Sequence, residues 1–222
     1  MLRMIGSYLL ALGGAALPAR ACDLALLLAV DISGSVDPRE YRIQMQGLAD
    51  GLRDGVVSEA LVRGQAKVAV MQWTGSTRQQ ITVTWSSMTT FADVEALAVR
   101  VETAPRAWRN YSTAVGEAMA VGLRRFEDVS PCRRKVMDIS GDGEANEGMS
   151  TAAPRAALSH AGITVNGLAI DTNNEDLTGW YWENVITGAG AFVVTANDFS
   201  EYPRAIRLKL IRETSSPVAL RQ

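Results

Sequence analysis

The sequence contains little of what zinc clusters, nucleic-acid-binding proteins or membrane-embedded proteins require. Its 222 residues include one histidine and two cysteines, with 24 acidic and 22 basic residues. The formal net charge of -2 gives no reason to expect a nucleic acid or an anionic membrane as partner. No repeats or linkers interrupt the chain, and 47% of its residues are hydrophobic. A single domain with a substantial core is therefore the simplest organisation.

The first 21 residues differ from the rest and predict a secretory signal peptide. Arg3 gives a positive start, residues 4–17 form a short apolar stretch, and residues 19–21 offer small side chains at the cleavage spacing. A membrane anchor is disfavoured because a spanning helix needs about 20 apolar residues, and no later run reaches that length. Lipidation of Cys22 is the less favoured alternative. We expect a secreted or periplasmic product without a membrane span after signal removal.

Export makes the two cysteines candidates for a disulfide. Cys22 lies nine residues before Asp31, and Cys132 lies ten residues before Asp142. If both aspartates end neighbouring parallel strands, both cysteines lie level at the opposite end of the sheet. The spacing therefore favours a Cys22–Cys132 bridge, and two unpaired thiols are the alternative.

Apolar periodicity predicts strands that alternate with helices. We expect a doubly wound α/β fold: a mainly parallel six-stranded sheet with one antiparallel edge strand and helices on both faces. The domain is expected over residues 22–212, followed by a polar tail at 213–222. The predicted strands are 24–30, 67–73, 79–85 (antiparallel), 134–140, 163–170 and 191–195, and the predicted helices are 40–53, 91–102, 113–126, 152–161, 176–186 and 202–211.

The most informative segment is a buried strand that runs directly into a polar loop. Residues 24–30 are seven consecutive apolar residues, typical of a strand that is covered on both faces. Three oxygen-bearing side chains then alternate along the loop: Asp31, Ser33 and Ser35. A carboxylate and two hydroxyls offer only oxygen, which a hard cation such as Mg²⁺ prefers. A turn that caps a helix explains the same residues, so this segment alone leaves both interpretations open.

Two later segments favour the metal interpretation. The strand at 134–140 ends in a glycine-flanked turn that carries Asp142, and Thr113 stands at the start of a predicted helix. Taken singly, Asp142 could cap backbone amides and Thr113 could be an ordinary N-cap. A helix–loop–helix calcium site at 138–149 is excluded because Met149 stands where a bidentate Glu is required. Together the three segments offer five oxygen-bearing side chains: Asp31, Ser33, Ser35, Thr113 and Asp142.

The three segments resemble the von Willebrand factor type A (vWA) domain and its metal-ion-dependent adhesion site (MIDAS). Asp31, Ser33 and Ser35 match the Asp-x-Ser-x-Ser motif of that family. Thr113 stands in the place of its metal-binding threonine, and Asp142 matches its later aspartate. The similarity extends over about residues 23–212. The stretches VDISGSVDPREY, MDISGDG and ITVNGLAI are most similar to a bacterial secreted branch of the family.

The resemblance implies a role for each residue. Ser33, Ser35 and Thr113 would bind the ion through their hydroxyls, while Asp31 and Asp142 would act largely through bound waters. Mg²⁺ (or Mn²⁺) is the implied cofactor, with an open coordination position that accepts an Asp or Glu carboxylate from a protein partner. Zinc is not expected, because one histidine and two bridged cysteines cannot supply its usual ligands.

The predicted function is an exported, metal-dependent protein-binding module and not an enzyme. A Ser–His–Asp hydrolase would have to use His160, which is better explained as a partly exposed residue at a helix end. A metal-assisted hydrolase would need a general base near the ion, and Glu144 is the uncommitted candidate. The alternative function is a structural domain of an envelope assembly, in which the metal only stabilises the loops.

Aromatic residues near the predicted site are candidates for a partner-binding rim. Trp108 and Tyr111 belong to this rim together with Glu144, although packing onto their own loop explains the two aromatics equally well. Residues 180–182 (Trp-Tyr-Trp) lie in a short helix, where core packing of one or two is the better explanation. The acidic loop at 171–176 is interpreted as a solvated turn ending in an N-cap, with a second ion as the alternative.

Overall fold

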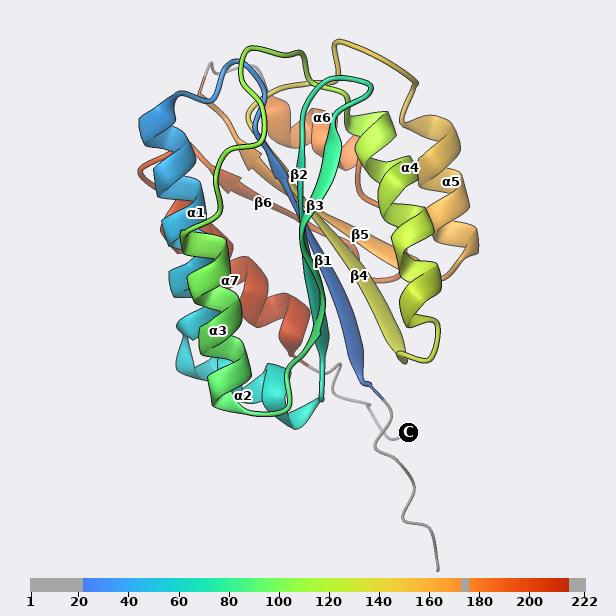
Figure 1. Ribbon diagram of the computed structural model, residues 1–222. Coiled ribbons are helices and arrows are strands. Elements are labelled where there is room, and N and C mark those ends of the chain that lie inside the picture. Colours follow the sequence, from blue (N-terminus) through green and yellow to red (C-terminus); the bar gives the residue numbers. More distant parts are fainter. Residues whose placement is uncertain (1–21, 173–175, 216–222) are drawn as a thin grey trace, which may run out of the picture.

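The structure, a computed structural model, describes residues 22–172 and 176–215. Its centre is a six-stranded sheet in the order β3-β2-β1-β4-β5-β6 (Figure 1). Strand β3 is antiparallel to β2, and the other neighbours are parallel, so the predicted sheet is confirmed. The strands are β1 (Leu24–Asp31), β2 (Lys67–Trp73), β3 (Gln79–Ser87), β4 (Arg134–Gly141), β5 (Ile163–Ile170) and β6 (Val193–Ala196).

Helices cover both faces of the sheet, as Figure 1 shows. One face packs against α1 (Pro38–Arg53), α2 (Gly55–Arg63), α3 (Phe91–Glu102) and α7 (Tyr202–Thr214). The other face packs against α4 (Val115–Arg125), the 3₁₀ segment η1 (Phe126–Val129), α5 (Ala152–His160) and α6 (Leu177–Asn184).

Strand β1 lies in the middle of the sheet and contributes to both cores. All eight of its residues are buried. Leu26 and Leu28 pack under α1 and α7, while Ala25 and Leu27 pack on the opposite face. Because both faces are covered, the strand is apolar throughout, and its polar residues begin only at the carboxyl end.

Helix α2 is not predicted by the sequence. Its first turn contains Gly55 and the β-branched Val56 and Val57, which are weak helix formers. A cap and buried side chains outweigh this weakness: the Asp54 carboxylate accepts hydrogen bonds from the amides of Val56 and Val57, and the Val57 and Leu61 side chains are buried.

Two further boundaries differ from those predicted. Helix α4 begins at Val115, with Ala114 as an N-cap that makes no side-chain hydrogen bond, so the predicted start at Thr113 is wrong. Helix α7 continues to Thr214, and both Glu213 and Thr214 are buried, so these residues belong to the domain and not to a polar tail. The predicted signal peptide (residues 1–21) and residues 216–222 of the predicted tail lie outside the described residues.

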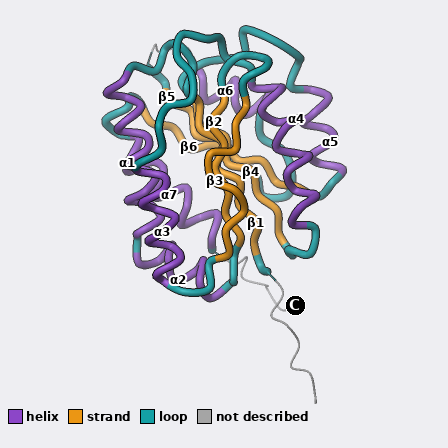
Figure 2. The backbone as a smooth tube through the Cα atoms, viewed as in Figure 1, coloured by secondary structure: helices purple, strands orange, loops and turns teal. Residues whose placement is uncertain are grey.

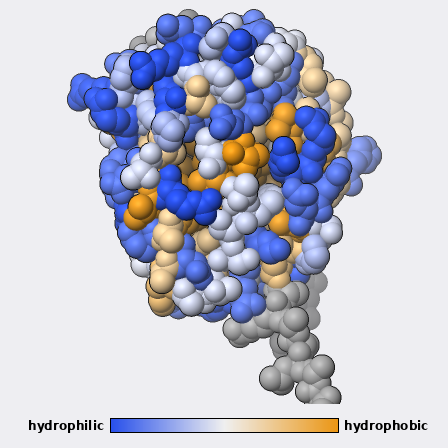
Figure 3. Space-filling view, in the orientation of Figure 1, coloured by the Kyte–Doolittle hydropathy of each residue, from blue (hydrophilic) through white to orange (hydrophobic). Residues whose placement is uncertain are grey.

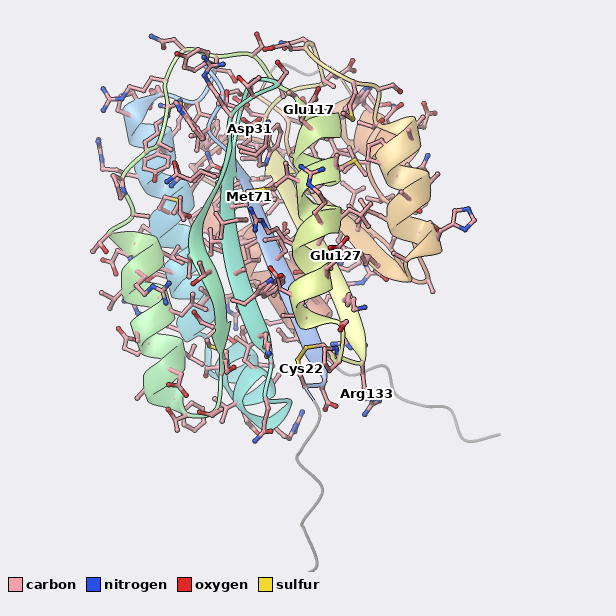
Figure 4. The ribbon with its side chains drawn as sticks, turned by 45° about the vertical axis from the view of Figure 1, so that its right-hand side comes forward. Cys22, Asp31, Met71, Glu117, Glu127 and Arg133 are labelled. Carbon is pink, nitrogen blue, oxygen red and sulfur yellow. A yellow bond between two sulfur atoms is a disulfide. The ribbon has the colours of Figure 1, made fainter. Side chains whose placement is uncertain are left out.

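Cys22 and Cys132 form a disulfide, which confirms the predicted pairing. The bridge lies at the end of the sheet where β1 and β4 begin, far from Asp31 (Figure 4). Within the part of the chain that the structure describes, no helix combines the length and apolar character needed to cross a bilayer.

Candidate metal centre

The candidate centre lies where the order of the strands reverses. Strand β1 pairs with β2 on one side and with β4 on the other, so the chain leaves the two central strands in opposite directions. Figure 2 shows that the long loops gather at this end, beyond the carboxyl ends of the strands. Ligands of open α/β sheets bind at such a switch point.

The loop after β1 brings its three oxygen side chains to the loop after β4. The Asp31 Oδ1 atom accepts a hydrogen bond from the Ser33 amide (2.7 Å), which folds the loop back on itself. The hydroxyls of Ser33 and Ser35 lie 3.2 Å apart, and Ser35 Oγ donates to Asp142 Oδ1 at 2.8 Å. The structure therefore joins four of the five predicted residues through direct contacts.

Thr113 reaches the same place on the loop between α3 and α4. Its amide donates to Asn146 Oδ1 (2.9 Å), and its carbonyl accepts from the Asn146 amide (3.0 Å). A Cβ built on Gly143, next to Asp142, would lie 3.9 Å from Thr113 Oγ1. Because Thr113 precedes the helix and caps nothing, its hydroxyl is available to a ligand.

Gly141 makes room for the innermost carboxylate. A Cβ at this position would lie 2.8 Å from Asp31 Oδ2 and 2.7 Å from the Tyr181 hydroxyl. Both of those oxygen atoms are buried and have no hydrogen-bond partner among the described residues. A buried carboxylate oxygen without a partner carries a desolvation cost that a bound cation would relieve.

The electrostatics of the two aspartates fit a cation. Burial, and then the charge of Asp142, raise the pKa of Asp31 well above its usual range. Burial also raises the pKa of Asp142, although the hydrogen bond from Ser35 opposes this. Neither carboxylate forms an ion pair with a Lys or Arg of the described residues. Two buried carboxylates without an ion-pair partner among the described residues, beside three hydroxyls, suit a divalent ion bound through oxygen.

The described residues contain no group of three or more His, Cys, Asp or Glu side chains that could hold a metal. The candidate centre contains two such side chains, Asp31 and Asp142, beside three hydroxyls. A centre of this kind would depend on Ser33, Ser35 and Thr113 for direct ligands and on two carboxylates for charge.

Several residues that support the centre are not predicted by the sequence. Glu147 accepts hydrogen bonds from the amide and hydroxyl of Ser76, and Glu117 accepts one from the Met149 amide (2.7 Å). These bonds tie the loop at 142–151 to the β2–β3 turn and to α4, where Glu117 is labelled in Figure 4. They link residues of ordinary polar type that are far apart in sequence, so no local pattern reveals them.

The predicted rim residues have different surroundings. Tyr111 is 40% exposed, and the Arg78 guanidinium carbon lies 3.6 Å from the centre of its ring. Glu144 is exposed on the loop after β4. Trp108 is partly buried and packs against the hydrophobic core. In the space-filling view, hydrophilic residues cover most of the end that carries the loops (Figure 3).

The other singled-out residues lie away from the centre or support the core. His160 is the last residue of α5, shortly before β5 begins, and is therefore at the opposite end of the sheet from Asp31. Tyr181 is fully buried, whereas Trp182 is 58% exposed. Asp176 caps α6 by accepting from the Gly179 amide (3.0 Å), as predicted, and residues 173–175 lie outside the described residues.

Comparison with known proteins places the chain in a family. A family model described as "Protein of unknown function (DUF1194)" matches residues 21–218. The chain belongs to the DUF1194 family. A search of curated proteins gives no match to this DUF1194 chain.

Solved structures show that this DUF1194 chain has a vWA-like fold. A von Willebrand factor type A protein from Catenulispora acidiphila superposes with a TM-score of 0.63 at 16% identity, over 86% of this chain and 43% of that one. The pilus adhesin SpaC from Lactobacillus rhamnosus GG gives a TM-score of 0.64 at 11% identity, over 88% and 31%.

Proximal thread matrix protein 1 of the mussel byssus, in a form whose MIDAS motif holds zinc, gives a TM-score of 0.62 at 17% identity, over 88% of this chain and 50% of that one. The DUF1194 chain therefore spans half or less of the length of these three proteins. At such identities the likeness establishes the fold.

Proposed function

We propose that the protein is an exported, divalent-metal-dependent protein-binding module. The observation that carries this proposal is the pair of buried carboxylates, Asp31 and Asp142, which share one hydroxyl-lined site and have no ion-pair partner among the described residues. A divalent ion would offset both negative charges and gain direct ligands from the hydroxyls of Ser33, Ser35 and Thr113. The disulfide supports export, because such bonds persist in oxidising compartments.

We propose Mg²⁺ or Mn²⁺ as the resident ion. Hydroxyl and carboxylate oxygens are hard ligands that suit these ions, and Mg²⁺ keeps several of its waters. Zinc in the MIDAS motif of the mussel protein supports a divalent ion at this place in the fold. It also makes zinc a necessary comparison in any titration, although the chain lacks the His and Cys ligands that zinc prefers.

We propose that the partner is a protein that presents an Asp or Glu carboxylate to the ion. Few direct ligands of the ion are anionic, so the bound metal keeps positive character and attracts an incoming carboxylate. The similarity in fold to a pilus adhesin and a thread matrix protein supports a role in protein interaction. Tyr111, half exposed beside Arg78, and Glu144 are available to contact the partner around the ion.

The proposed role is not enzymatic. A Ser–His–Asp hydrolase would need His160, which lies at the opposite end of the sheet from Asp31. Glu144, the candidate base for a metal-assisted hydrolase, is exposed, and we assign it to partner contact instead. The second candidate function is a structural domain in which the ion only stabilises the loops. The observation that favours it is that Asn146, Glu147 and Met149 join the loop at 142–151 to the Thr113 loop, to the β2–β3 turn and to helix α4.

The experiment that separates the two functions combines partner capture with thermal unfolding. Wild type and Thr113→Ala are immobilised with Mg²⁺ or with EDTA, and proteins of the native envelope extract are captured and then identified. A binding module should lose the same captured protein on EDTA treatment and in Thr113→Ala, with little change in melting temperature. Capture that survives both treatments would defeat the binding proposal, and a marked fall in melting temperature would favour the structural role.

A further inference from the structure

Arg106 makes an unusual pair of contacts with the loop after β1. Its Nη2 atom donates hydrogen bonds to the carbonyl oxygens of Ile32 (2.9 Å) and Ser33 (2.8 Å). Arg106 belongs to the loop between α3 and α4, which also carries Thr113. A single guanidinium therefore links the segment that bears Ser33 to the segment that bears Thr113.

The backbone on both sides of Arg106 is held by buried polar groups. The Gln72 side chain, fully buried on β2, donates to the Pro105 carbonyl (3.1 Å) and accepts from the Ala107 amide (2.9 Å). The Tyr41 hydroxyl of α1 donates to the Ala104 carbonyl (2.9 Å) and accepts from Gln72 (2.8 Å). These bonds fix the loop on the sheet and on α1, so the Arg106 side chain extends from a rigid base.

The contacts of Arg106 determine how Ser33 is presented. The Ser33 amide is bound to Asp31 Oδ1, and the Ser33 carbonyl is bound to Arg106. With both of its backbone polar groups held, Ser33 directs its hydroxyl toward Ser35, 3.2 Å away. One further tie joins the same two loops, from the Gly34 amide to the Tyr111 carbonyl (2.7 Å).

We propose that Arg106 is a positioning residue that holds the loop after β1 in its metal-binding geometry before the ion arrives. This inference rests on the proposed metal site. A loop that is already ordered loses less conformational entropy when the ion binds, so preorganisation raises the affinity. Residues that orient metal ligands through hydrogen bonds typically change metal affinity by about 10- to 100-fold when they are replaced.

A purely electrostatic role for Arg106 makes the opposite prediction. The guanidinium charge acts on both Asp31 and Asp142 and lowers the pKa of each. If this charge were its only contribution, removing it would leave the site more negative and would strengthen cation binding. The direction of the change in Mg²⁺ affinity therefore distinguishes positioning from charge.

The test is calorimetric titration of Mg²⁺ into wild type, Arg106→Met, Arg106→Lys and Arg109→Met. We expect Arg106→Met to weaken Mg²⁺ binding about tenfold or more, and Arg106→Lys, which restores one donor group, to have an intermediate affinity. Arg109→Met removes an exposed charge from the same loop and should bind Mg²⁺ within about twofold of wild type, since it deletes no loop-ordering contact.

Hydrogen exchange of the metal-free protein measures directly how well ordered the loop after β1 is. We expect amides 32–36 to exchange faster in Arg106→Met than in wild type, while the amides of β2 are unchanged. Mg²⁺ affinity in Arg106→Met that equals or exceeds that of wild type overturns the inference, as does unchanged exchange at 32–36. If wild type itself binds no Mg²⁺, the proposed function fails first, so the two failures are distinguishable.

Discussion

At the scale of single residues, the candidate centre depends on the close contact between Asp31 and Gly141. Asp31 is completely buried, and its Oδ2 atom lies against Gly141 with no hydrogen-bond partner in the described part of the chain. A methyl group at Gly141 would be 3.1 Å from the Asp31 Cβ as well as 2.8 Å from Oδ2. The glycine is therefore required by close approach, and not by an unusual backbone angle.

Gly141→Ala should displace Asp31 and weaken Mg²⁺ binding by about 10- to 100-fold, at a cost in stability of about 1 to 3 kcal/mol from overpacking. Gly143→Ala is the matched control, because its Cβ would meet only Thr113 Oγ1 at an ordinary 3.9 Å. Metal titration and urea unfolding of both variants check this. Equal affinities in the two alanine variants would contradict the geometry described for Gly141.

That Asp31, Ser33, Ser35 and Asp142 lie together could be predicted from their local context, whereas Thr113 is singled out by the family resemblance. Asp31, Ser33 and Ser35 come at and after the end of a continuous apolar strand, and Asp142 stands in a glycine-flanked turn after a second predicted strand. Arg106 and Asn146 could not be predicted in the same way. Their roles arise from bonds to backbone groups of other loops, and a polar residue in a loop carries no sequence signal of which backbone group it will meet.

At the scale of elements, the contact of α7 with the sheet contains buried charges. The Lys209 ammonium lies 2.6 Å from Asp138 Oδ2 on β4 and 2.7 Å from Glu213 Oε1, one turn further along α7. Asn166 of β5 donates to the same Glu213 oxygen (2.8 Å). One lysine thus faces two carboxylates, so burial and then Asp138 raise the pKa of Glu213 to about 7, from an ordinary value of 4.5.

This shift predicts how stability depends on pH. Between pH 4.5 and 7 the folded protein holds a proton on Glu213 that the unfolded chain has released, so stability falls as the pH rises through this range. The loss is on the order of 3 kcal/mol. Glu213→Gln, which stays neutral and keeps an acceptor for Lys209, should remove this part of the slope. Urea unfolding at several pH values with excess Mg²⁺ measures it, and identical slopes in both proteins would contradict the assignment.

Elements differ in how well the sequence predicts them. The predicted bounds of β5 and α3 match the observed ones, because the apolar residues of each end at a turn or a cap. Helix α2 has no clear sequence signal, because the Asp54 cap and the buried contacts of Val57 and Leu61 outweigh its weak propensity. The predicted start of α4 is wrong because Thr113 is a favourable N-cap by type, yet its hydrogen bonds to Asn146 hold it outside the helix.

At the scale of the whole molecule, the candidate metal centre and the disulfide lie at opposite ends of the sheet. The loops and the candidate centre lie at the carboxyl ends of the strands, and the Cys22–Cys132 bridge joins β1 to β4 at the other end (Figure 4). The bridge spans 110 residues of sequence and fixes the two strands whose far ends carry Asp31 and Asp142.

The disulfide should contribute strongly to stability but not to metal binding. For a closed loop of 110 residues, the chain-entropy model gives about 4 to 5 kcal/mol. The Cys22→Ser/Cys132→Ser double variant should lose about this amount in denaturant unfolding and keep its Mg²⁺ affinity when folded. A loss below about 1 kcal/mol would be inconsistent with this loop-closure account, and a lost affinity would show that the two ends are coupled.

The most direct test of the metal centre is calorimetric titration of Mg²⁺ and Mn²⁺ into the folded protein, with zinc for comparison and with Thr113→Ala and Glu144→Gln titrated in parallel. We expect wild type to bind one divalent ion per chain, Thr113→Ala to bind it far more weakly, and Glu144→Gln, whose exposed side chain is not a ligand, to bind it almost normally. No Mg²⁺ or Mn²⁺ binding at millimolar concentration, or binding that is unaffected by Thr113→Ala, would contradict the central claim that Asp31, Ser33, Ser35, Thr113 and Asp142 form a metal centre.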